Sequence, residues 1–185
     1  LAATSFLRLL VNHATHYPEA ACVFSDVQWF GTRIDRVESP SLTGFALDRV
    51  LRQIEAGHYA PFFGLVRAEV LASVGPIRLT PEQSALEDQV WLARLAGHGP
   101  WHRVPGTLYF KRGHVDEAHL NWESATDTAS RRQIWLEWGA GMLEAALSVS
   151  PQQEHGRLFD LLNARLSVPG NGRWMFFDAH GMGLS

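Results

Sequence analysis

The residues best suited to chemistry fall into two groups, an acidic pair and a basic cluster that follows it. Glu87 and Asp88 begin a segment with helical periodicity, and Lys111, Arg112 and His114 end the apolar segment after it. In a proton-transfer reaction, Asp88 could act as a general base toward a hydroxyl while Glu87 orients the ligand or the local structure. We expect the helix N-terminus to lower the pKa of Asp88 and keep the carboxyl ionised near neutral pH, which is the form that a base requires.

Each group also has a purely structural interpretation. Acids in a first helical turn complement the partial positive charge there, worth about 0.3–1 kcal/mol each. Cations at the end of a strand commonly lie in solvent. The chemical interpretation of the basic cluster is a site for a departing diphosphate, whose charge Arg, Lys and a metal-held His can neutralise. The combination of both groups in one short unit favours a shared site.

Histidines offer further candidate ligands, but only in pairs: His13 with His16, His98 with His102, and His114 with His119. None of these pairs is flanked by a Cys or lies in a His-Glu helix signature. A metal-dependent hydrolase is therefore the weakest of the functional hypotheses.

Several other residues that could carry chemistry have a structural explanation. Cys22 lies between apolar neighbours in an expected strand and is interpreted as an inert core residue. Ser25 and Asp26 follow at the end of that strand, where we expect a turn rather than the edge of a pocket. Trp135 and Trp138 share helical spacing and are expected in the core.

Composition excludes several classes of protein. The chain has 185 residues, 46% of them hydrophobic, which fits one domain or part of a larger one and is too apolar for disorder. A net charge of −3 with dispersed Lys and Arg disfavours a nucleic-acid partner. No apolar run is long enough for a membrane span, and the first ten residues lack the features of a signal peptide. One cysteine excludes an intrachain disulfide. We expect a cytoplasmic protein.

Helical and strand patterns alternate along most of the chain and predict a mixed α/β fold with a helical end. The segment 27–41 carries turn residues and is expected to be a loop with one possible strand. Helices are predicted over 4–16, 43–57, 68–75, 86–96, 127–149 and from 151 onward, and strands over 20–26, 59–67 and 103–112.

Three stretches, "HYAPFFGLVRAEVLASVG", "ALEDQVWLARLAGHG" and "RVPGTLYFKRGH", together resemble the second half of a family 2 glycosyltransferase of GT-A fold. The features that match are a strand with a small residue, an Arg-started helix ending in Gly, a Glu-Asp pair on a helix, and a strand ending in Arg-x-His. The likeness is good over residues 59–114, weaker over 1–30 and absent after about residue 120.

The resemblance implies an inverting transfer of a sugar from a nucleotide-diphosphate donor to a hydroxyl acceptor, helped by Mn²⁺ or Mg²⁺. Asp88 is then the expected base, with Glu87 beside it. His114 would lie near the metal, and Arg112 with Lys111 near the diphosphate. The residues expected to border the acceptor lie around Pro61 to Gly64, including Phe63 and Gly64, and at Trp91.

The chain also departs from that family. The nucleotide-binding half and its Asp-x-Asp metal motif have no counterpart here, since "FSDVQ" follows the helix instead of preceding it. We therefore expect residues 1–120 to form the acceptor-side half of a GT-A-like domain and 121–185 a helical extension. Alone, the chain is expected to bind no metal and to catalyse no transfer.

A rival hypothesis is a non-enzymatic binding or assembly module. The Trp-rich helices after residue 125 could dock a partner. The sheet edge left open in half of such a fold could pair with a second copy of the chain to form a homodimer.

Overall fold

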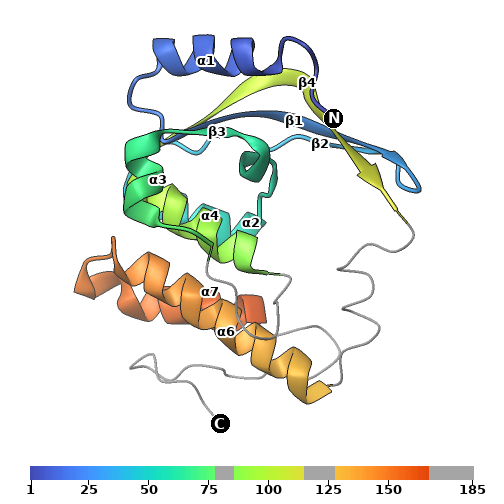
Figure 1. Cartoon of the computed structure of the whole chain (residues 1–185). Helices are drawn as coiled ribbons and strands as arrows, with labels where there is room; N and C mark the ends of the chain where they lie inside the picture. The colour runs from blue at the N-terminus through green and yellow to red at the C-terminus, as the bar shows by residue number, and fades with distance from the viewer. Residues whose placement is uncertain (78–85, 115–127, 167–185) are drawn as a thin grey trace.

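The computed structural model describes residues 1–77, 86–114 and 128–166 and is an α/β fold, as predicted. A mixed four-stranded sheet has helix α1 on one face and helices α2, α3 and α4 on the other, with α6 and α7 in a further layer beyond α4 (Figure 1). The helices are α1 (Phe6–His16), α2 (Ala46–Ala56), α3 (Ala68–Val74), α4 (Glu87–His98), α6 (Thr128–Leu147) and α7 (His155–Leu166). The strands are β1 (Cys22–Gly31), β2 (Asp35–Val37), β3 (Leu65–Val66) and β4 (Trp101–Gly113).

Strand β1 is the centre of the sheet. On one side it pairs in parallel with β4 over its whole length, from Cys22 opposite Trp101 to Gly31 opposite Gly113. On the other side it pairs antiparallel with β3 near its start and with β2 near its end. The β1–β4 register shifts on either side of Asp26, so β4 bulges where Gly106 adopts a φ of 105°.

Strand β1 is longer than the sequence pattern predicts. We expected it to end at Asp26 with a turn at Ser25 and Asp26, and this is wrong, because the strand continues to Gly31 and the short strand β2 follows. The strand residues after Asp26 include Val27, Trp29 and Phe30, and β-branched and aromatic residues suit a strand. Trp29 in this segment is only 3% exposed.

The segment 59–67 is mostly not the strand that its apolar content suggested. Its first part is a 3-10 helix, η1 (Ala60–Phe63), and only Leu65 and Val66 pair with β1. Pro61 lies in the first turn of η1, where its fixed φ is favourable and its missing N–H costs nothing. The result is a turn that presents aromatic side chains instead of an alternating strand.

Helix ends were predicted more accurately. Gly57 ends α2 in the left-handed conformation, with φ 60° and ψ 40°, as its position suggested. Helix α3 ends before Gly75, and α4 extends two residues beyond the predicted end at Ala96. None of the helices that the structure describes is both long and apolar enough to cross a bilayer.

One large hydrophobic core holds the sheet together with helices α4, α6 and α7. It includes side chains from β1, β4, α4, α6 and α7, among them Phe24, Trp101, Leu92, Met142 and Leu162. The helices after residue 121 therefore share a core with the sheet. Trp138 is buried in this core and Trp135 packs against it, as predicted.

A second, small cluster of Leu10, Ala20 and Val23 lies under α1. Cys22 is fully buried, and burial raises the pKa of its thiol far above the usual range, so it is the inert residue expected.

Candidate functional site

The site lies where the parallel strands β1 and β4 end together. In open α/β sheets, ligands bind outside the carboxyl ends of parallel strands. Trp29 and Lys111 are register partners close to this end. Helix α4 runs back toward the start of β4, so its first turn returns to the same end of the sheet and brings Asp88 near Lys111.

Asp88 occupies the first turn of α4 and is partly buried. Burial raises the pKa of its carboxyl, while the N–H of Gln89, which donates to Asp88 Oδ1 at 2.8 Å, and the nearby charge of Lys111 act in the opposite direction. The net shift of the pKa is upward, so the expected lowering by the helix N-terminus is wrong, because the effect of burial is larger. Glu87 is also partly buried, but neighbouring positions on a helix point about 100° apart, so the two carboxylates face different directions.

Lys111 is held by aromatic rings at the end of β4. Its ammonium lies 4.2 Å from the ring centre of Trp29 and 5.5 Å from that of Phe63, distances suited to cation–π attraction. The guanidinium of Arg33 lies 4.8 Å from the Trp29 ring centre as well. Because the charge of Lys111 also acts on the carboxyl of Asp88, we assign these two residues to the same candidate site.

The three residues of the predicted basic cluster do not share one direction. Alternation along β4 points Arg112 to the face opposite that of Lys111, and Arg112 is exposed. His114 follows the last residue of the strand and is exposed too. The structure thus brings Asp88 and Lys111 together, while Arg112 lies on the other side of the sheet.

A group of rings, which we call the aromatic cluster, lines the site between η1, α4 and β4. Phe63 stacks on Tyr109 with ring centres 4.6 Å apart and an angle of 13° between the planes. Phe62 makes edge contacts with Phe63 at 5.5 Å and with Trp91 at 6.1 Å. The cluster comprises Trp29, Tyr59, Phe62, Phe63, Trp91 and Tyr109.

Two residues predicted to border the acceptor, Trp91 and Gly64, are involved mainly in packing within the fold. Trp91 is 8% exposed, and its indole N–H donates to the carbonyl of Gly75 at 3.0 Å. Gly64 faces β1, since a Cβ there would lie 2.7 Å from the carbonyl oxygen of Val23. A side chain at this position would push η1 away from the sheet, so the glycine sets how closely the aromatic turn approaches β1.

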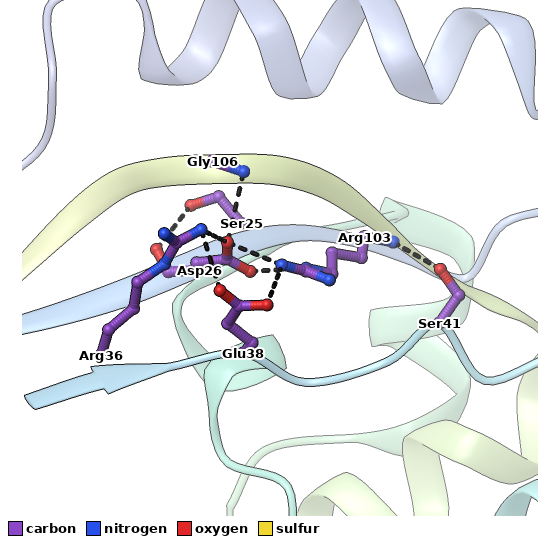
Figure 2. Close-up of polar contacts among 7 residues, drawn as sticks. All are labelled: Ser25, Asp26, Arg36, Glu38, Ser41, Arg103 and Gly106. Atoms are coloured by element: carbon purple, nitrogen blue, oxygen red, sulfur yellow. Dashed lines mark hydrogen bonds and ion pairs between the residues drawn. The ribbon is translucent and has the colours of Figure 1, made fainter.

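A second charged centre lies in the middle of the sheet, and the sequence reasoning missed it. Asp26 is fully buried, and both of its carboxylate oxygens accept hydrogen bonds from Arg103, at 2.5 and 2.8 Å (Figure 2). Arg36 donates to Oδ2 at 2.8 Å, and the N–H of Gly106 at 3.2 Å. Glu38 pairs with both arginines.

Asp26 is held in its ionised form by these partners. Burial pushes the pKa of the carboxyl up, but the hydrogen bonds from Arg103 and Arg36 outweigh it, so the net pKa is lowered. The cluster ties β2, β1 and β4 together at the bulge of β4. Its positive and negative charges balance, which is typical of a structural centre.

Two histidines that lie far apart in the sequence are close together in the structure, and sequence spacing did not suggest this pair. His13 of α1 and His102 of β4 lie 5.9 Å apart, and each contacts the ring of Tyr17, at 4.6 and 4.3 Å. Of the pairs proposed from spacing, His114 with His119 involves a residue outside the described part of the chain. Across residues 1–77, 86–114 and 128–166, no three His, Cys, Asp or Glu side chains form a group that could hold a metal ion.

The described residues therefore do not by themselves form the metal site that the resemblance implies. Mn²⁺ and Mg²⁺ prefer several oxygen ligands, and His114 offers a single imidazole at an exposed strand end. Comparisons with protein-family models, with curated proteins and with solved structures found no match to this chain.

Proposed function

We propose that residues 1–120 provide the acceptor side and the general base of an inverting glycosyltransferase, with the nucleotide-sugar bound by residues outside this chain. One observation carries the proposal. Asp88 is a partly buried acid with a raised pKa, beside an ammonium and an aromatic cluster, at the carboxyl ends of two parallel strands. Perturbed carboxyl groups in such positions are typical of catalytic sites.

The environment of Asp88 suits proton abstraction from a hydroxyl. A raised pKa makes the carboxylate a stronger base, and the nearby charge of Lys111 acts in the direction that favours its ionised form. In the proposed step, the acceptor oxygen forms a bond to the anomeric carbon and its proton passes to Asp88. The bond from that carbon to the diphosphate breaks, and its electron pair leaves with the diphosphate.

For Lys111 we propose a role different from the one expected. Its ammonium is fixed over Trp29 and Phe63 on the side of Asp88, so it tunes the base and can donate to an acceptor hydroxyl. His114, which follows the end of β4, remains a candidate for the diphosphate, whereas Arg112 points to the opposite face of the sheet.

The test is Asp88→Asn in the complete translation product that contains residues 1–185, assayed for nucleotide release from a panel of nucleotide-sugars. We expect kcat to fall at least about 100-fold, because loss of a general base typically costs that much, while donor affinity is kept. Asp48→Asn is a matched control, since Asp48 is an exposed acid in the first turn of α2 and also complements a helix N-terminus. Near-normal turnover of Asp88→Asn would remove Asp88 from the base role.

A further inference from the structure

Two imidazoles meet at the C-terminal end of α1, on the face of the sheet that this helix covers (Figure 1). His13 lies in the last turn of α1, and His102 is the second residue of β4. Their ring centres are 5.9 Å apart, and the ring of Tyr17 lies 4.6 Å from the first and 4.3 Å from the second. Both histidines are partly buried, and the side chain of His102 is only 15% exposed. A charge on either imidazole therefore acts directly on the other.

A permanent cation already occupies this end of α1. Arg67, the N-cap residue of α3, donates hydrogen bonds to the carbonyl oxygens of Ala14 at 3.0 Å, Tyr17 at 3.1 Å and Ala20 at 2.7 Å. The last carbonyls of a helix carry partial negative charge, which would otherwise favour a protonated histidine there. Because Arg67 neutralises these carbonyls, a further cation at the same end gains little from them.

The negative charge available to balance protonated histidines is small. The acid that the structure places at this end of α1 is Glu19, whose carboxylate lies 3.5 Å from His102 Nε2. Its side chain is 54% exposed, so solvent screens the attraction. Strands β1 and β3 face α1 with the apolar side chains Val23 and Leu65. The other charged or titratable side chains at this end of α1 are His16 and Arg67.

We propose that His13 and His102 form a pH-sensitive latch, which holds the C-terminal end of α1 on β4 at neutral pH and releases it when both rings are protonated. Two cations about 6 Å apart repel each other, and Arg67 adds a third positive charge. The apolar contact that opposes release is small, since the fully buried residues under α1 are Leu10, Ala20 and Val23. The latch lies on the face of the sheet away from α4, so this inference does not depend on the proposed function (Figure 1).

The direction of the pH dependence agrees with this arrangement. The pKa of His13 is lowered from its usual value of 6.5, first by burial and then by the charges of His102 and His16. A histidine whose pKa is lower in the folded state binds protons more readily when its surroundings open. Its contribution to stability is therefore present above pH 6.5 and is lost as the pH falls below that value.

The test is amide hydrogen exchange of α1, followed by NMR on residues 1–185 between about pH 7.5 and about pH 5 and corrected for intrinsic exchange. We expect the protection of α1 amides to fall at least about threefold relative to those of β1, the effect of two unit charges about 6 Å apart in a well-solvated setting. His13→Gln and His102→Gln should each remove most of this loss, because only one ring of the pair can then become charged.

His98→Gln is the matched control, because His98 is an exposed histidine in the last turn of α4. This variant should keep the full acid-dependent loss of α1 protection. His16 is present in every variant, so its own titration cancels from the comparison. Amide NMR spectra at neutral pH establish that each variant is folded, and either latch variant is sufficient for the test.

A second measurement examines the coupling of the two rings. NMR titration of the imidazole signals should give a higher pKa for His13 in His102→Gln than in the unmodified chain, because a neighbouring cation has been removed. An unchanged His13 pKa overturns the latch. So does α1 protection that is constant with pH, or that falls as much in the latch variants as in His98→Gln. A loss confined to the unmodified chain and His98→Gln supports it.

Discussion

Asp26 is fully buried and Asp88 is partly buried, and the surroundings of these two carboxyls shift their pKa values in opposite directions. Asp26 lies under two arginines and the N–H of Gly106, and the pKa of its carboxyl is lowered. Asp88 accepts hydrogen bonds from the backbone N–H of Gln89 and from its own, lies near the charge of Lys111, and has a raised pKa because of burial. Full compensation produces a fixed structural charge. Incomplete compensation leaves a group that can exchange a proton, which is the property a reaction needs.

The largest effect should come from removing the compensated charge. We expect Asp26→Ala to lower the free energy of unfolding by about 1.5–3 kcal/mol, because it removes the charged acceptor that Arg103, Arg36 and Gly106 share, while Glu38 still pairs with both arginines. Urea denaturation measures this. Asp160→Ala, at an exposed position of α7, should stay within about 0.5 kcal/mol of the unmodified chain. Similar values for both variants would show that the buried cluster contributes little.

Asp88→Asn should act in the opposite direction. A carboxyl whose pKa is raised on folding destabilises the folded state once the pH exceeds its unfolded pKa, so removing it should stabilise the chain at pH 7 by about 1 kcal/mol or less. The gain should disappear below about pH 4, where the unfolded carboxyl is protonated as well. Urea denaturation across pH 3–8 is the measurement, and a destabilised Asp88→Asn at pH 7 would contradict the assignment.

For Asp26, the pH dependence of the free energy of unfolding should have the opposite sign. Its pKa is lowered on folding, so its contribution is present above the unfolded pKa and is lost as the pH falls through the folded one. The unmodified chain should therefore lose stability steeply on acidification, and Asp26→Ala should show a flatter acid dependence.

The smallest expected effect concerns Lys111. Lys111→Met should raise the pKa of Asp88 further, because it removes the one side-chain charge that opposes the effect of burial there. Carboxyl-detected NMR titration of the unmodified chain and the variant gives the change directly. Arg112→Met is the control, since Arg112 is the next residue of β4 and lies on the opposite face of the sheet. An unchanged Asp88 pKa in Lys111→Met would show that the charge of Lys111 does not act on that carboxyl.

The sequence allowed the fold class and most helices to be predicted, because their signals are local. Gly57 and Gly75 end their helices through local backbone preferences that do not depend on tertiary packing. The apolar period of residues 43–57 is likewise enough to predict one helix. Asp88 could be proposed as a candidate for the same reason, since an acid pair at a helix start is visible in the sequence.

The errors came from long-range contacts. Asp26 looked like a turn residue because its partner Arg103 is 77 positions away, and a polar residue within a strand is visible only when that partner is known. Phe62 and Phe63 are neighbours of one chemical type. Only the packing of Tyr109 and Trp91 distinguishes the exposed ring from the covered one. Local sequence contains neither fact.

The pairing of β1 with β4 has a consequence for how the chain folds. The strands meet in parallel, and Cys22 and its partner Trp101 are 79 positions apart in the chain, so the central contact of the sheet closes a long loop. Such closures are slow relative to helix formation. During synthesis, the apolar β1 leaves the ribosome well before β4 and must wait with one hydrogen-bonding edge unpaired. The late arrival of β4 makes this interval the time when aggregation and chaperone binding compete with folding.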